Sequence, residues 1–150
     1  MKKEKLKKIN LVSSDNPVLF DHAKKVENIR AEVEPLLKKM RKILDQKKGL
    51  GLAAPQVGFG IRFFISRIDG CNVAINPKWG PNGISQETES EGCLTWPGQR
   101  KKVERYSSIN AVWTDRKGNI HRKVLYGLEA IIFQHEWDHL NGVCIFEPKK

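Results

Sequence analysis

The sequence has little of what marks secreted, membrane-spanning or disulfide-rich proteins. It contains three cysteines, Cys71, Cys93 and Cys144, which are too few and too irregularly spaced for a disulfide framework. No apolar run approaches the roughly 20 residues that a membrane-spanning helix needs. The basic segment over residues 1–10 is not followed by the apolar stretch and small-residue cleavage site of a signal peptide. These absences predict a cytoplasmic protein without a membrane partner.

Acidic residues are also scarce relative to basic ones. Lys and Arg number 27 against 17 Asp and Glu, which gives a formal net charge of +10. Such a surplus favours contact with polyanions such as RNA, ribosomes or anionic membranes, but an ordinary solvated surface explains it equally well. The lysines are scattered and lack the interleaved aromatic residues of single-strand binders. Charge alone therefore identifies no partner and predicts no specific nucleic acid.

The chain also lacks internal repeats, low-complexity tracts and linkers. Its 150 residues, of which 39% are hydrophobic and 29% charged, are typical of a globular protein with one core. We therefore expect a single domain over residues 1–150.

Hydrophobic spacing predicts the order of the elements. Residues 28–47 form an amphipathic helix, with Pro35 in its first turn or at a kink; its apolar stripe consists of Val33, Leu36, Leu37, Met40, Ile43 and Leu44. Stretches rich in β-branched and aromatic residues and bounded by turn residues then predict antiparallel strands at residues 61–66, 72–77, 102–115 and 119–126.

A helical period returns at Gly127. Leu128, Ile131, Ile132, His135 and His139 share one stripe, and Asn141-Gly142 suits a left-handed C-cap. The whole order predicts an α+β fold, with antiparallel β-sheets packed around a C-terminal helix and an amphipathic helix near the N-terminus.

This last helix carries His135-Glu136-Trp137-Asp138-His139. Residues four apart lie one turn apart on the same face, so both imidazoles can bind one metal ion while Glu136 reaches a water on it. Because both histidines continue the stripe that faces the core, they need partners to offset burial. Backbone carbonyls would also satisfy them, which is the structural alternative to a metal site.

A third ligand is not evident downstream. Zinc metalloproteases with this pattern can carry a third His six residues after the second, where this chain has Ile145, and Glu147 is the only acidic residue that follows. Upstream, Cys93 follows Glu91-Gly92, and a thiolate is a strong metal ligand, although a lone buried Cys is more often a small hydrophobe. Further upstream, residues 49–58 form a Gly- and Ala-rich segment around Gln56.

Taken together, three stretches resemble the peptide deformylase family, whose motifs are G-φ-G-φ-A-A-x-Q, E-G-C-φ-S and H-E-φ-D-H, where φ is apolar. Here they stand at residues 49–56, 91–95 and 135–139, in the same order. Thr95 stands where the family usually has Ser, and Trp137 is large for its position. The amphipathic helix ending at Gly49 and the pair Asn76-Pro77 extend the resemblance over most of the chain.

The resemblance implies a metal-dependent hydrolase that removes the formyl group from the formyl-methionine of nascent proteins and releases formate. Cys93, His135 and His139 would bind the metal, and a hydroxide on it would attack the formyl carbon. The Gln56 amide and the Leu94 backbone N–H would stabilise the charge on the formyl oxygen. Glu136 would pass the proton of the water to the leaving amine.

The same resemblance implies the substrate contacts. The methionine pocket would be lined by Leu50, Leu128, Ile131 and Ile132, although core packing is an alternative for Leu128 and, less so, for Ile132. Backbone groups around Leu50, Gly51, Glu91 and Gly92 would hold the peptide as an added strand, with Arg100 on its carboxyl side. Asp138 and Arg105 match positions where a buried ion pair would orient the metal helix, and an ordinary surface pair is the alternative. The native ion would be Fe²⁺, while Zn²⁺, Ni²⁺ or Co²⁺ suit the same ligands.

Two other functions remain open at this point. The His-Glu-x-x-His pattern by itself fits a zinc endopeptidase, which would not need Cys93 for its metal. The basic composition fits a ribosome- or RNA-binding protein with a structural metal, which would not need Glu136. A transient contact with the ribosome, where formylated chains emerge, is compatible with the deformylase interpretation.

Overall fold

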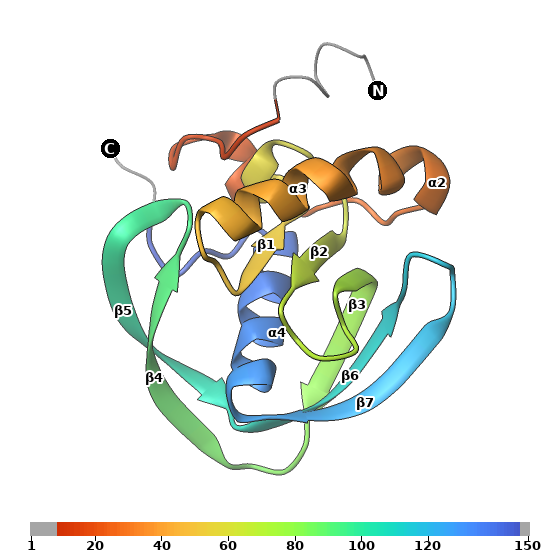
Figure 1. Ribbon diagram of the computed structural model, residues 1–150. Coiled ribbons are helices and arrows are strands. Elements are labelled where there is room, and N and C mark those ends of the chain that lie inside the picture. The colour runs from red at the N-terminus through yellow and green to blue at the C-terminus, as the bar shows by residue number, and fades with distance from the viewer. Residues whose placement is uncertain (1–8, 148–150) are drawn as a thin grey trace.

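The computed structural model describes residues 9–147 (Figure 1), so the basic run at residues 1–8 and the final Pro-Lys-Lys lie outside the described residues. Its elements follow in chain order: η1 (Pro17–Phe20), α2 (Ile29–Glu32), α3 (Glu34–Gln46), β1 (Gly51–Ala53), η2 (Ala54–Val57), β2 (Phe63–Ser66), β3 (Val73–Pro81), β4 (Gln86–Cys93), β5 (Trp96–Tyr106), β6 (Ser108–Thr114), β7 (Ile120–Tyr126) and α4 (Gly127–Leu140).

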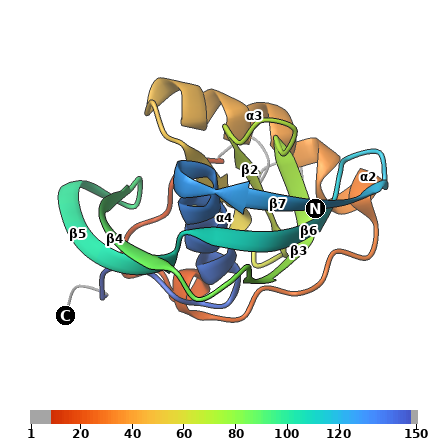
Figure 2. The ribbon, with the colours of Figure 1, turned by 90° about the horizontal axis from the view of Figure 1, so that it is seen from below.

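The predicted α+β fold, with antiparallel sheets around the C-terminal helix, is confirmed. One sheet has five strands in the order β1-β2-β3-β6-β7, and β4 and β5 form a separate two-stranded hairpin. Every pairing in both sheets is antiparallel. Figures 1 and 2 both place α4 between the β4–β5 hairpin on one side and strands β2 and β3 on the other.

Strand β2 is buried on both faces because a helix covers each side of it. Phe63 and Ile65 pack into the cluster formed with α3, whereas Phe64 packs with Phe133 of α4. Alternate residues of a strand point to opposite faces, so three consecutive apolar residues serve two layers of the core. This continuous burial explains why the segment reads as an unbroken apolar run.

The helix predicted over residues 28–47 is interrupted. A single turn, α2, is capped by the Asn28 side chain, which accepts from the Ala31 N–H, and α3 begins only at Glu34. Pro35 lies in the first turn of α3, where its missing N–H removes no helical hydrogen bond. The predicted stripe from Leu36 to Leu44 is buried.

The strand predicted over residues 102–115 is in fact two strands in different sheets. β5 ends at Tyr106 and β6 begins at Ser108. At the crossing, the Gln134 side chain of α4 accepts from the Tyr106 N–H (3.0 Å) and donates to the Tyr106 carbonyl (2.8 Å). The break falls at Ser107, between β-branched and aromatic residues on both sides, and the pair Ser107-Ser108 was too weak a turn signal to divide the predicted strand.

Strand β4 was not predicted at all. Its sequence QETESEGC is polar, and most of its residues are exposed up to Ser90. Strand propensity measures mainly how well a residue suits a half-buried pleated surface. A polar strand paired on one edge only, as β4 is with β5, gives no such signal.

Helix α4 is surrounded by the rest of the fold. Leu128 at its start is 59% exposed, so the expectation that it continues the core stripe is wrong, because its side chain lines the cleft described below and not the core. The predicted C-cap is confirmed, with Gly142 at φ 72°. A Cβ on Gly142 would lie 2.6 Å from the Phe20 carbonyl oxygen, so the exit of α4 packs tightly against η1.

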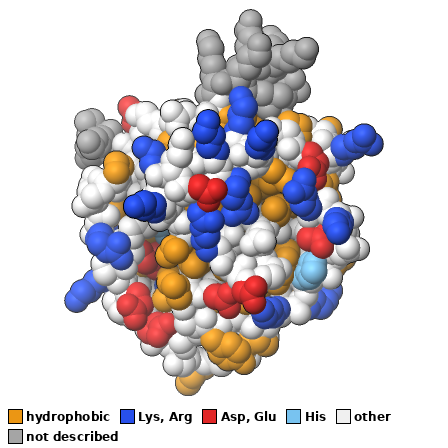
Figure 3. All heavy atoms as spheres, in the orientation of Figure 1, with side chains coloured by type: hydrophobic (Ala, Val, Ile, Leu, Met, Phe, Trp, Pro, Cys, Tyr) orange, Lys and Arg blue, Asp and Glu red, His pale blue; other side chains and the backbone are white. Residues whose placement is uncertain are grey.

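The surface agrees with the basic composition. Lys and Arg side chains are spread across the face shown in Figure 3, with Asp and Glu between them, rather than gathered in one patch. The described chain has no helix that combines the length and the apolar character needed to cross a membrane. Its three cysteines are all free.

Candidate active site

A cleft of about 1020 Å³ lies where α4, the β4–β5 hairpin and the segment leading into β1 meet. It is lined by residues of all three sequence motifs, including Gly49, Leu50, Gly51, Gln56, Glu91, Gly92, Cys93, Leu94, Thr95, His135 and Glu136. Segments up to 87 residues apart in the chain therefore converge on one cavity. The three motifs, which are separate in the sequence, thus line the same cavity in the fold.

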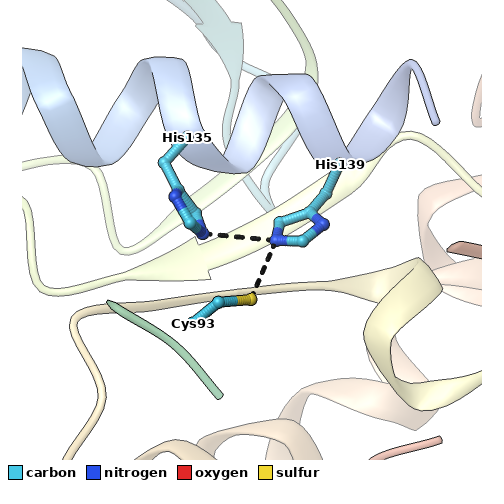
Figure 4. Close-up of side chains that lie close together, drawn as sticks. All are labelled: Cys93, His135 and His139. Carbon is cyan, nitrogen blue, oxygen red and sulfur yellow. Dashed lines mark hydrogen bonds between the residues drawn. The ribbon is translucent and has the colours of Figure 1, made fainter. Parts of the chain in front are cut away.

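Cys93, His135 and His139 form a buried cluster in this cleft (Figure 4). The two histidines project from the same side of α4, and Cys93 approaches them from the tip of the β4–β5 hairpin, where only Leu94 and Thr95 separate the strands. The Cys93 sulfur is 3.5 Å from His139 Nε2, which is 3.2 Å from His135 Nε2. All three donor atoms lie within 4.8 Å of one another.

The two separations of 3.2 and 3.5 Å are close to those of donor atoms around a single metal ion. Tetrahedral coordination with bonds of about 2.0–2.1 Å to nitrogen and about 2.3 Å to sulfur separates neighbouring donors by about 3.3–3.6 Å. Without a cation, two Nε2 atoms at 3.2 Å require a shared proton. Although burial opposes it, the neighbouring Glu136 and Cys93 raise the pKa of His135 to about 10, whereas burial and His135 lower that of His139. The site thus favours one positive charge among its donors.

The outer nitrogen of His135 is held by a buried chain of charges. His135 Nδ1 is 2.9 Å from Glu91 Oε1, and Arg105 donates to both oxygens of Glu91 at 2.8 and 2.9 Å. Arg105 also donates to Asp138 at 2.6 Å. Burial would raise the pKa of Glu91, but its hydrogen bonds from Arg105 and His135 outweigh burial and bring it to about 2.

These hydrogen bonds show whether Arg105 and Asp138 pair in the interior or at the surface. Arg105 is 7% exposed and Asp138 25% at the side chain, so the contact belongs to the interior and not to an ordinary surface pair. It ties the hairpin to α4 through residues on both sides of the metal-binding cluster. Hydrogen bonding from His135 Nδ1 to Glu91 also directs His135 Nε2 towards Cys93 and His139.

We expect Arg105→Met to destabilise the protein by about 3–5 kcal/mol, because it leaves Glu91 and Asp138 charged in the interior without their partner. Arg116→Met is the matched control, since Arg116 pairs with Glu34 at the surface, where the two side chains are 54% and 33% exposed, and should cost at most about 1 kcal/mol. Urea unfolding of both variants at one fixed metal concentration measures the difference. Equal costs would contradict an energetically important interior chain.

Glu136 lies beside the cluster, and one of its carboxylate oxygens makes no hydrogen bond to the described residues. Its side chain is buried, its Oε2 is 4.0 Å from His135 Nε2, and its Oε1 has no hydrogen-bond partner among the described residues. Burial raises the pKa of Glu136 to about 7. A carboxyl group with a pKa in this range can both accept and release a proton near neutral pH.

Gly51 explains why the segment before β1 is rich in glycine. A Cβ at this position would lie 2.6 Å from Glu136 Oε2 and 2.9 Å from its Cγ. Gly49 is similarly confined, since its Cβ would lie 2.8 Å from Leu94 Cδ1. The segment therefore runs so close to Glu136 and Leu94 that these two positions leave no room for a side chain.

Gln56 is buried and oriented by three contacts. Its Oε1 accepts from the Ala53 N–H at 2.9 Å, so its amide nitrogen points to Thr95 Oγ1 at 3.1 Å and Cys93 Sγ at 3.5 Å. Thr95, which replaces the family's Ser, thus keeps a hydroxyl where the amide can donate. The side-chain amide and the turn that contains Leu94 lie on the same side of the cleft as Cys93.

The expected pocket residues differ in exposure. Leu50 and Leu128 are 49% and 59% exposed, whereas Ile131 and Ile132 are each 7% exposed, and all four line the cleft. Ile132 also packs into the core with Phe133, so the core-packing alternative holds in part for Ile132 and not for Leu128. Arg100 lies at the rim and donates to the Ser90 hydroxyl and carbonyl at 3.1 and 2.5 Å.

Two residues near the site were missed from the sequence. Gln134 hydrogen-bonds to the backbone N–H and carbonyl of Tyr106, and its position just before the motif at residues 135–139 gave no reason to expect this. Cys144 follows α4 and lies 3.7 Å from His139 Nδ1; burial raises the pKa of its thiol to about 12. The tight Asn141-Gly142 turn was the one signal that the chain folds back beside His139.

Comparison with known proteins agrees with this geometry. The sequence model of the polypeptide deformylase family matches residues 8–150. A peptide deformylase of Thermotoga petrophila is 38% identical over 133 residues, which is 88% of this chain and 81% of the relative. Peptide deformylase 2 of a Nostoc species is 35% identical over 149 residues, covering 91% of this chain and 83% of the relative.

Solved structures show the same likeness. The crystal structure of peptide deformylase from Thermotoga maritima superposes with a TM-score of 0.86 at 33% identity, over 95% of this chain and 97% of that one. A peptide deformylase from Synechococcus elongatus in complex with actinonin superposes with a TM-score of 0.85 at 34% identity, over 95% and 80% of the two chains. The family model, the sequence relatives and the solved structures thus agree, and the chain belongs to the polypeptide deformylase family.

Proposed function

We propose that this chain is a single catalytic domain that removes the N-formyl group from the formyl-methionine of nascent proteins in the cytoplasm, releasing formate in a metal-dependent hydrolysis. The observation that carries the proposal is the buried cluster of Cys93, His135 and His139 with Glu136 beside it, open to a cleft in a chain of this family.

Cys93, His135 and His139 would hold one divalent metal ion. A bound metal supplies a Lewis acid that lowers the pKa of a water molecule to near neutrality. The donor set of one thiolate and two imidazoles suits Fe²⁺, Zn²⁺, Co²⁺ and Ni²⁺. We propose Fe²⁺ as the native ion. Three protein ligands leave room for water or substrate, which distinguishes a catalytic site from a closed structural one.

Glu136 would carry the proton. Its Oε1, which has no hydrogen-bond partner within residues 9–147, and its raised pKa support a role in taking the proton from the attacking water and giving it to the nitrogen of methionine. Without that proton the amine would have to leave as an anion. Glu136 is a buried carboxylate that a purely structural metal site does not require.

Gln56 and Leu94 would stabilise the negative charge that develops on the formyl oxygen. Preorganised donors are effective because they need no rearrangement during the reaction. The Ala53 N–H fixes the Gln56 side chain with its NH₂ group towards Cys93. Leu94 follows Cys93 directly in the hairpin turn, so its backbone N–H lies next to the same position.

The substrate peptide would lie between two strand edges. β1 is the last strand of its sheet and β4 has only β5 as a neighbour, and the cleft is lined from both sides. Backbone groups of Leu50, Gly51 and Gly92 would pair with the peptide as with an added strand. Arg100 would contact its carboxyl side, and Leu50, Leu128, Ile131 and Ile132 would surround the methionine side chain.

For Glu91 we propose an orienting role in place of direct substrate contact. Its carboxylate is only 6% exposed and both oxygens accept hydrogen bonds from Arg105 or contact His135. A substrate group would have to displace these partners. The Glu91 backbone still contributes to the cleft wall.

A transient ribosome contact is a separate proposal. It is supported by the net charge of +10 and by the Lys and Arg side chains spread over the surface (Figure 3). Interactions of this kind are screened by salt, so the association should fall as salt concentration rises. Co-sedimentation with ribosomes at increasing salt tests it.

The decisive experiment for the proposed function is formate release from formyl-Met-Ala-Ser, with the metal content measured on the same anaerobic sample. We expect formate in proportion to bound metal, and loss of activity in air if the ion is ferrous. Fully metal-loaded protein that releases no formate would contradict the proposal. Cleavage of internal peptide bonds without formate would instead support the endopeptidase alternative.

A further inference from the structure

The outer nitrogen of His139 has an unusual partner. A metal-binding histidine commonly donates its second ring N–H to a carboxylate or carbonyl group, which fixes the tautomer and the orientation of the ring. His135 follows this pattern through Glu91. At His139 Nδ1, the contact within the described chain is the sulfur of Cys144, at 3.7 Å.

The direction of this contact follows from a second one. The Cys144 sulfur is also 3.7 Å from the Leu19 carbonyl oxygen, to which its S–H donates. A thiol has one proton and a carbonyl has none, so the Cys144 proton is committed to Leu19. The sulfur can then only accept from His139, which places the ring proton on Nδ1.

We propose that Cys144 is a positioning residue for the metal site: it accepts the Nδ1–H of His139 and thereby leaves Nε2 free to bind the metal. A neutral imidazole carries one proton, and His139 Nε2 is the atom that faces His135 and Cys93. The inference rests on the proposed metal-dependent function, because it assigns the residue that prepares one of the three ligands.

The surroundings hold Cys144 in place from both sides. Leu19 is fully buried in η1, and Gly142 is in van der Waals contact with the backbone of Phe20. After Cys144, the Ile145 carbonyl accepts from Lys101 Nζ at 3.0 Å, and the Phe146 ring lies 5.7 Å from that of Trp96. The sulfur is therefore fixed by packing that does not depend on His139.

The test compares Cys144→Ala with Cys144→Ser, using zinc-loaded protein in competition with a chelator. Ser keeps a hydroxyl that can donate to Leu19 and accept from His139, whereas Ala removes the acceptor. We expect zinc affinity to fall roughly 10- to 100-fold in Cys144→Ala and to stay within a few-fold in Cys144→Ser. Cys71→Ala is the matched control, because Cys71 is buried in the core away from the cluster, and its zinc affinity should not change.

A spectroscopic readout separates positioning from packing. In the zinc-loaded wild type and Cys144→Ser, the His139 Nδ1 proton should give an NMR signal protected from exchange with water, and Cys144→Ala should lose that protection. Wild-type zinc affinity in Cys144→Ala, equal losses in both variants, or an unprotected wild-type proton would each overturn the proposal. Should Cys144→Ala fail to fold, the wild-type and Cys144→Ser spectra still decide it. Formate release by the wild type is independent of these outcomes.

Discussion

Replacing Glu136 by Gln is expected to lower turnover of a formylated peptide by about 10²- to 10⁴-fold while the bound metal and the fold stay unchanged. The amide has nearly the same shape and still fits beside Gly51, whose hydrogen atom leaves only enough room for this side chain. What it loses is the ability to accept a proton and release it again. The three proposed metal ligands are not altered.

The measurement is kcat for formyl-Met-Ala-Ser together with metal content and the urea unfolding midpoint. Glu129→Gln is the matched control on the same helix, since Glu129 accepts from the Asp69 N–H at the surface and is remote from the cluster. It should keep normal turnover. Near-normal turnover in Glu136→Gln would remove Glu136 as the proton carrier and leave the metal site without an assigned base.

Cys93→Ser is expected to lose the metal, and formate release with it. A serine hydroxyl remains protonated where a thiolate would bind the ion, so the loss of affinity should exceed the roughly 10- to 100-fold that removal of an outer partner costs. Cys93 Sγ also contacts Gln56 and His139, and serine keeps a polar group of slightly smaller size there, so we expect the fold to stay intact.

Metal content after dialysis, measured alongside the unfolding midpoint, gives the result. Cys71→Ser tests whether loss of any buried cysteine has the same effect; it should retain the ion. A Cys93→Ser protein that keeps its metal would favour the zinc endopeptidase, for which two histidines and another ligand suffice. Loss of the metal with an unchanged unfolding midpoint would show that the stability of the fold does not depend on the metal site.

The site motifs were visible in the sequence because each depends on near neighbours. Two histidines four apart share one helix face whatever the helix packs against, and Asn141-Gly142 ends α4 by its own backbone preference. Leu128 lies in the same periodic pattern yet is 59% exposed, because periodicity gives the face of a helix and not how far the rest of the fold covers it. Strand β4 left no signal because most of its residues are polar and exposed.

The sequence by itself determined the α+β class, the helix that carries His135 and His139 with its C-cap, and the three motifs, since periodicity, spacing and capping act over a few residues. Only the tertiary structure decided which partners the ligands acquire. The Glu91–Arg105–Asp138 chain spans three elements, and the contact of Cys144 with Leu19 joins residues 125 positions apart. Such pairs are fixed by how buried surfaces pack together, which no local pattern contains.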